Sequence, residues 1–206
     1  MLASLHEANG CFPTLHSAVV LPHTAFLLAL WGDAIMTDVL AMVKAILATT
    51  ATRWLNMTEA LPIDLLNRQP TAGEWSATAC LIHLLDTEHI FPARVQALLA
   101  RQAIPAFDPD KQGTKNTTSS PGKLATEFAS LRRASLAVLE RVTTQDFNST
   151  AEHSELGTVT LSQLLHEWAA HDLNHTIQAE RAVMQPFIQG SGPWRSYFQD
   201  HEVANK

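Results

Sequence analysis

A long helical pattern with two histidines one turn apart constrains this chain more than any other feature. The pattern runs from Thr160 to Met184 and contains the segment His171-Asp172-Leu173-Asn174-His175. Four residues at about 100° each leave the two imidazoles only about 40° apart around the helix axis. Both rings therefore lie on one face of the helix, an arrangement that suits a metal ion.

The ends of this helix are marked by local signals. Thr160 and Gln163 form a T-x-x-Q capping box, Gly157 closes the preceding turn, and Pro186 is expected to end the helix. Apolar residues recur at helical spacing at Leu161, Leu164, Leu165, Trp168, Ala169, Ala182 and Val183. The two histidines share a stripe with Leu164 and Trp168, so both rings face the interior. Each ring either donates to a carbonyl or a water there or binds a metal, whose third ligand must come from elsewhere in the fold.

Length and charge restrict the class of protein. A chain of 206 residues is expected to form one domain with a single core. The net charge of -6, the pI near 5.9 and the lack of a basic block argue against a nucleic-acid partner and against an anionic membrane. Cys11 and Cys80 form no disulfide framework and no zinc motif, which indicates a cytoplasmic protein of the reducing cytosol.

The chain divides into three regions. Residues 1–36 are expected to be a poorly ordered N-terminal extension or, alternatively, a docked accessory helix. Their apolar patch is too short to span a membrane, and the first basic residue is Lys44, so no secretory signal is expected. Residues 37–184 are predicted to form a helical bundle. Residues 185–206 are predicted to be a tail that wraps the bundle through Trp194, Tyr197 and Phe198.

Three further helices are predicted within the bundle. The first spans about residues 37–59, the second runs from the N-cap Ser76 to about 101, and the third runs from Ser120-Pro121 to about 142. Trp75 is expected to pack on Cys80, and Arg132 to lie on a solvated face. The long connection at 102–120 can cross from one end of a bundle to the other, which favours parallel second and third helices.

The remaining histidines carry less weight than the pair. His83 lies in the apolar pattern of the second helix, where a lone histidine is usually a satisfied core residue. It becomes a candidate ligand only because the last helix already offers two inward imidazoles. His153 and His166 fall off the main stripe and are interpreted as surface or supporting residues, with residues 148–159 as a loop into the last helix.

A combination of motifs resembles a known family. The chain resembles the DinB/YfiT-like superfamily over about residues 37–184, through Gly73-Glu74-Trp75-Ser76, His83-Leu84-Leu85-Asp86-Thr87-Glu88 and His171-Asp172-Leu173-Asn174-His175-Thr176-Ile177-Gln178. The resemblance implies an all-α, up-down-down-up four-helix bundle with a long crossover between helices two and three. It also implies that His83, His171 and His175 bind a divalent metal, zinc or nickel, and that the protein is a homodimer.

The resemblance further implies a metal-dependent transferase that activates a low-molecular-weight thiol, such as bacillithiol or mycothiol, against a small electrophilic substrate. Three neutral imidazoles leave a divalent ion its full charge and an open position, which agrees with this use. The alternatives are a non-catalytic metal-binding bundle for stress response or protein association, and a metal-dependent hydrolase.

Supporting residues are less constrained by the sequence. Asp172 and Gln178 are candidates to orient the ligands, although Asp172 equally fits a charge on a solvated helix face. The general base is unknown, because Asp86, Glu88 and Glu167 are candidates of equal weight.

Overall fold

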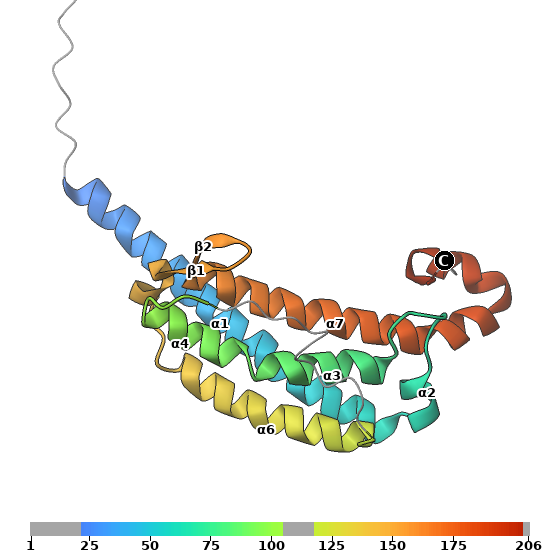
Figure 1. The fold of residues 1–206 in the computed structure, drawn as a ribbon. Helices are drawn as coiled ribbons and strands as arrows, with labels where there is room; N and C mark the ends of the chain where they lie inside the picture. Colours follow the sequence, from blue (N-terminus) through green and yellow to red (C-terminus); the bar gives the residue numbers. More distant parts are fainter. Residues whose placement is uncertain (1–21, 105–117, 204–206) are drawn as a thin grey trace, which may run out of the picture.

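The computed structural model describes residues 22–104 and 118–203, and the side chains of the first helix from Val39 onward. Four long helical segments form a bundle with a small hairpin near one end and a short 3-10 helix at the other (Figure 1). The elements in chain order are α1 (Pro22–Ala60), α2 (Ile63–Asn67), α3 (Ala77–Glu88), α4 (Phe91–Leu99), α6 (Pro121–Leu139), η1 (Thr144–Asn148), β1 (Thr150–His153), β2 (Gly157–Thr160), α7 (Leu161–Gly190) and η2 (Gly192–His201).

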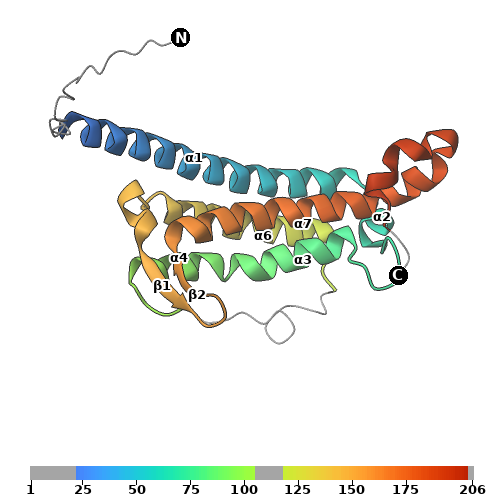
Figure 2. The ribbon, with the colours of Figure 1, turned by 90° about the horizontal axis from the view of Figure 1, so that it is seen from above.

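The bundle has the predicted up-down-down-up topology. In Figure 1, α1 and α7 run in one direction, whereas α3, α4 and α6 run in the other. Helices α1 and α3 each pack against both α6 and α7, and Figure 2 shows α1 lying along α7 from above. Because α3 and α6 are parallel, the chain between them must return along the bundle, as the length of the 102–120 connection predicts. Most of that connection, residues 105–117, lies outside the described residues.

Helix α1 begins earlier than expected. It starts at Pro22 rather than near residue 37, and it continues without interruption to Ala60. A helix tolerates proline in its first turn, because the N–H that proline lacks would have no partner within the helix there. Pro22 therefore marks a start rather than an interruption. The predicted disorder of residues 1–21 lies outside the described residues.

The predicted second helix is two helices. Helix α3 ends at Glu88 and α4 begins at Phe91, with the amides of His89 and Ile90 bonded to Asp86 and Thr87 in tight turns. Pro92 explains the break, because it has no N–H to donate to the carbonyl four residues earlier and its ring crowds that carbonyl. The break places Phe91 at the start of a new helix, where its ring stacks on Trp168 with 4.8 Å between ring centroids.

The segment predicted as a loop before α7 forms an antiparallel hairpin. Thr150 pairs with Thr160 and His153 with Gly157, and the amide of Ile104 donates to the carbonyl of Glu152 at 2.8 Å. β-Branched residues suit these short strands, and Gly157 adopts the positive φ of 73° that the turn requires. The short 3-10 helix η1, which includes Asp146 and Phe147, precedes the hairpin.

Helix α7 begins as predicted and ends later. The Thr160–Gln163 capping box is formed, but the helix passes through Pro186 to Gly190. Pro186 removes one backbone hydrogen bond, and the burial of Ile188 two residues later offsets part of that loss. The tail then folds back as η2.

Polar bonds, rather than the aromatic residues of the tail, hold η2 against α7. The side chain of Gln185 donates to the carbonyl of His201 and accepts from the amide of Val203. Trp194, Tyr197 and Phe198 are exposed. The prediction that these three rings wrap the bundle is therefore wrong.

The core consists of two clusters of buried apolar side chains. One includes Phe91 and Trp168 near the hairpin, and the other includes Trp54 and Phe128 toward the α2 end. No helix in the described part of the chain is both long and apolar enough to cross a bilayer.

Candidate metal centre

Three imidazoles from two helices converge inside the bundle. His83 is carried by α3, whereas His171 and His175 lie one turn apart on α7. Nε2 of His83 lies 3.0 Å from Nε2 of His171, and the ring centroids of His83 and His175 are 4.4 Å apart. One ring nitrogen from each of the three residues lies within 4.8 Å of those of the other two. The structure thus brings together the three residues that the sequence singled out.

The three rings are electrically neutral at physiological pH. Burial, followed by the charge of the neighbouring His175, lowers the pKa of His83 to about 4 and that of His171 to about 3. Burial also lowers the pKa of His175, which its hydrogen bond to Gln178 partly opposes. Neutral imidazoles keep a nitrogen lone pair for a ligand, so burial prepares the cluster for metal coordination.

Hydrogen bonding orients one of the rings. Nδ1 of His175 lies 2.9 Å from Oε1 of Gln178. An amide oxygen only accepts, so Nδ1 of His175 carries the proton and Nε2 keeps its lone pair. Gln178 therefore contacts the ring that it was expected to orient.

The separation of one pair of ring nitrogens fits a shared ion. Two nitrogens each about 2.1 Å from one ion lie about 3.0 Å apart at a right angle and about 3.4 Å apart at a tetrahedral angle. The separation of 3.0 Å between Nε2 of His83 and Nε2 of His171 falls at the first of these values. Nδ1 of His171 is buried and has no hydrogen-bond partner among the described residues. No group on that side of the ring therefore takes the proton from Nδ1.

Aromatic rings cover the cluster. Trp75 stacks on His175 with 5.6 Å between ring centroids and also contacts His83 at 5.1 Å. Gly73, at a φ of 84°, turns the chain before it, and Ser76 caps α3 by accepting from the amide of Ala79. The expected packing of Trp75 on Cys80 is not what the structure shows. Its ring covers the imidazoles instead.

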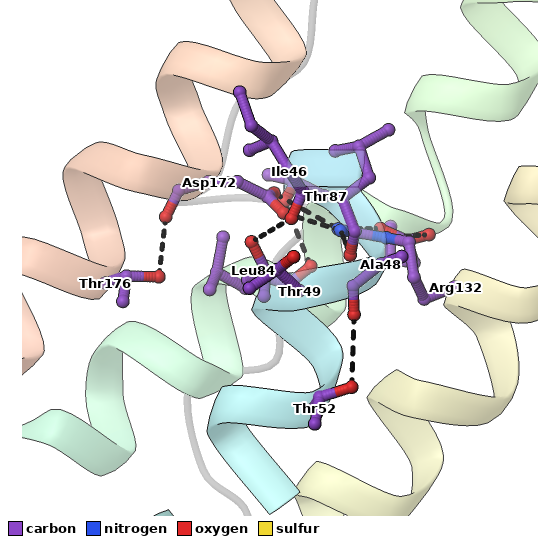
Figure 3. A network of polar contacts seen from close by, with 12 residues as sticks. Ile46, Ala48, Thr49, Thr52, Leu84, Thr87, Arg132, Asp172 and Thr176 are labelled. Carbon is purple, nitrogen blue, oxygen red and sulfur yellow. Dashed lines mark hydrogen bonds and ion pairs between the residues drawn. The ribbon is translucent and has the colours of Figure 1, made fainter. Parts of the chain in front are cut away.

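A buried ion network lies beside the cluster. Arg132 on α6 is 1% exposed, and it donates to both oxygens of Glu88 at 2.9 and 2.6 Å. It also donates to both oxygens of Asp172 at 2.5 and 3.1 Å, and to the carbonyl of Leu47 at 2.8 Å (Figure 3). Burial acts to lower the pKa of Arg132, but the two carboxylates outweigh it and raise that pKa.

The network corrects two expectations. Arg132 does not lie on a solvated face, because α6 directs it between α3 and α7. Asp172 is neither solvated nor bonded to an imidazole, since both of its oxygens accept from Arg132. Burial raises the pKa of the Asp172 carboxyl, and the charge and hydrogen bonds of Arg132 oppose that shift. With both carboxyls ionised, the network carries a formal charge of -1 one residue along α7 from His171, which favours a cation nearby.

The three candidate bases now differ. Glu88 is committed to Arg132. The charge of Asp86 raises the pKa of His83, although burial outweighs it. Glu167 lines a cavity of about 200 Å³ together with His83 and His171, and burial raises the pKa of its carboxyl. Glu167 is therefore the carboxyl group best placed to meet a molecule next to the imidazoles.

The other histidines lie apart from the cluster. His166 is exposed, and its Nδ1 lies 2.7 Å from the carbonyl of Ser162 on its own helix. His153 is part of β1 and lines a different cavity. Arg94, which lines the cavity beside His83, follows His83 on nearly the same face of the predicted second helix, but the sequence pattern assigned it no function.

Comparison with known proteins places the fold. The solved structure of YfiT from Bacillus subtilis, described as a probable metal-dependent hydrolase with an unusual four-helix bundle topology, superposes with a TM-score of 0.63. Its sequence is 18% identical, and the match covers 72% of this chain and 87% of YfiT. Among curated proteins, no sequence matches this chain. A model of the DinB superfamily matches residues 46–179, so the chain belongs to the DinB superfamily.

Proposed function

We propose that His83, His171 and His175 bind a divalent metal ion and that the protein is a metal-dependent enzyme acting on a small molecule. The observation that carries this proposal is the convergence of three neutral imidazoles from α3 and α7, with ligand nitrogens within 4.8 Å of one another. The proton on Nδ1 of His175 is held by Gln178, which leaves Nε2 free to coordinate.

The donor set narrows the metal. Imidazole nitrogens suit zinc, nickel, copper and iron, whereas magnesium and calcium prefer oxygen donors. No carboxylate or thiolate of the described residues belongs to the cluster, so the ion keeps its full double charge. We propose zinc or nickel as the resident ion.

An ion held there would lower the pKa of a thiol or water at its open position and so supply a nucleophile at neutral pH. The chain supplies the surroundings. Trp75 covers one side of the imidazoles, the cavity lined by Thr87 and Phe91 lies on another, and Glu167 faces that cavity. Because burial raises the pKa of Glu167, its carboxyl can hold a proton and exchange it with a bound substrate.

The first candidate activity is transfer of a low-molecular-weight thiol to a small electrophile. The DinB-like motifs around His83 and His171 support it. Zinc- or nickel-loaded protein is expected to accelerate the reaction of bacillithiol, mycothiol or a simpler thiol with 1-chloro-2,4-dinitrobenzene, whereas His171→Ala abolishes the acceleration. Loaded protein that is inactive with every thiol would overturn this activity and leave the metal site standing.

The second candidate is hydrolysis, because the structural neighbour YfiT is described as a probable metal-dependent hydrolase. Turnover of p-nitrophenyl esters without added thiol, lost in His171→Ala, would favour it over thiol transfer. A third candidate is a bundle that binds metal only for stability or association. It predicts no turnover in either assay and a large loss of stability when the metal is removed.

We further propose that the protein is a cytoplasmic homodimer. Support for self-association comes from the exposed apolar side chains of α7 and η2, among them Ile177, Phe187 and Trp194. Sedimentation equilibrium is expected to give twice the monomer mass. A single species at the monomer mass over the micromolar range would contradict it.

A further inference from the structure

The cavity beside the imidazoles has a polar side away from them. His83 and His171 line one part of this space of about 200 Å³, and Arg94 and Glu167 line another. Arg94 comes from α4, one turn after the break that Pro92 introduces, and Glu167 comes from α7, one turn before His171. A small molecule in this cavity therefore meets a cationic and an acidic side chain as well as the proposed metal.

A second cavity adjoins the first. It holds about 160 Å³ under the β1–β2 hairpin, and Arg94 and Glu167 line it too. Its remaining walls are mainly apolar, from Ile104, Leu156, Val159 and Leu164. The two cavities thus share a polar boundary, with the imidazoles on one side and an apolar compartment on the other. This arrangement matches the common design of small-molecule sites, in which apolar walls surround a few placed polar groups.

Arg94 has unused bonding capacity at this boundary. Its Nε atom is buried and has no hydrogen-bond partner among the described residues, although its guanidinium lies 6.0 Å from the ring centroid of Phe91 and its charge acts to lower the pKa of Glu167. Arg132, by contrast, bonds two carboxylates and a carbonyl. A buried N–H without an acceptor is costly, and a guanidinium pairs best with a planar carboxylate. The free donor at Arg94 therefore points to a carboxylate ligand.

We propose that the two cavities form one substrate site for a small carboxylic acid with an apolar group. Arg94 binds the carboxylate, the apolar group occupies the compartment under the hairpin, and the reacting part of the molecule extends toward His83 and His171. The inference rests on the proposed function in one respect, because the metal marks the end at which reaction occurs. Binding of the acid itself depends only on Arg94 and the apolar walls.

The inference is tested by binding of straight-chain carboxylates, from acetate to octanoate, to the metal-free and zinc-loaded protein in isothermal titration calorimetry. Affinity is expected to rise about two- to fourfold for each added methylene until the compartment is full. Straight-chain alcohols of equal length are expected to bind at least tenfold more weakly than the acids, because they lack the charge that Arg94 selects. Use of the metal-free protein excludes direct binding of the carboxylate to the ion.

Two variants separate the carboxylate contact from the apolar compartment. Arg94→Gln is expected to reduce carboxylate affinity at least tenfold and to remove the preference for acids over alcohols, with Arg133→Gln on the exposed face of α6 as the matched control. Val159→Phe is expected to fill the compartment and shift the tightest ligand to a shorter chain, without changing acetate binding. Circular dichroism melting checks that both variants fold.

The outcomes distinguish this inference from the metal proposal. Octanoate that binds no tighter than acetate, or Arg94→Gln that binds acids as well as wild type, would overturn it. In that case Arg94 serves only to balance the charge of Glu167. Neither result would contradict the proposed function, because that proposal is tested by the metal content, which is measured separately. Conversely, if the protein binds no metal but still selects carboxylates through Arg94, only the proposal of a metal-dependent enzyme is refuted.

Discussion

Nε2 of His83 lies 3.0 Å from Nε2 of His171, although the two residues are 88 positions apart in the chain. Neither helix contains a metal site by itself, since α3 offers one imidazole and α7 offers two. The site therefore exists only when α3 and α7 are packed together.

Loss of His83 is expected to lower metal content more than loss of any exposed histidine. Wild-type protein dialysed against zinc is expected to retain about one ion per chain, and His83→Ala much less, because two imidazoles hold zinc poorly. His166→Ala, on the exposed face of α7, is the control and should match wild type. Plasma mass spectrometry measures the zinc, and equal content in all three proteins would refute the site.

Removing the Oε1 acceptor that Gln178 offers to His175 is expected to lower the zinc affinity of the site without abolishing binding. Gln178→Leu leaves the proton on Nδ1 of His175 without its partner, so the ring loses its fixed orientation and the affinity for zinc falls about 10- to 100-fold. Gln178→Glu keeps an acceptor at that place and should restore most of the affinity. Competition with a chromophoric chelator gives the dissociation constants, and indistinguishable values for Leu and Glu would rule out this function of Gln178.

The metal-free protein is expected to lose stability as the pH falls below about 6.5. The pKa values of His83 and His171 are about 4 and about 3 in the folded chain, below the ordinary histidine value of 6.5. The unfolded chain therefore binds protons first, and the free energy of unfolding falls with pH by at most about 1.4 kcal/mol per unit for each histidine.

Urea titrations between pH 7.5 and 4.5 measure this slope. His171→Leu removes one of the three histidines with a depressed pKa and is expected to flatten the dependence relative to wild type. The exposed variant His166→Ala should keep the wild-type slope. A His171→Leu slope as steep as that of wild type would show that the buried histidines do not cause the loss.

Breaking the buried ion network is expected to be severe. Arg132→Met leaves the carboxylates of Glu88 and Asp172 buried without their partner, at a cost of about 3–5 kcal/mol in the free energy of unfolding. Arg133→Met, at the next and exposed position, should change it by less than about 0.5 kcal/mol. Urea denaturation at pH 7.5 measures both. A loss below about 1 kcal/mol for Arg132→Met would mean that the carboxylates find other partners.

Local signals made much of the fold predictable. The capping box of Thr160 and Gln163 starts α7, and Ser120-Pro121 starts α6, because each signal acts within one turn of its own helix. The family motifs correctly identified the DinB-like bundle, and the repeat at His171 and His175 indicated their shared face. Two prolines carry signals that the predicted helix bounds did not use: Pro22 fits a helix start, and Phe91-Pro92 fits a break.

Other features depend on contacts between distant segments. Arg132 follows the charged pattern of its own helix, and only the approach of Glu88 and Asp172 from other helices explains its burial. Nothing near His83 in sequence indicates its meeting with His171. It became a candidate ligand because it lies on an apolar helix face while the last helix offers two inward imidazoles, and the family resemblance then assigned it to the site. Trp75 likewise covers His175 because α3 and α7 are neighbours, which no pattern around residue 75 contains.

One guanidinium makes sliding between the helices of this bundle expensive. Apolar side chains tolerate a shift of one helix past another, because each apolar contact that is lost is replaced by another. Arg132 of α6 instead reaches Glu88 of α3, Asp172 of α7 and the carbonyl of Leu47 in α1. A shift of a single turn, about 5.4 Å, would leave a buried charge without its partner. The same ion network that disfavours such misalignment also fixes how far along the bundle axis His83 lies relative to His171 and His175.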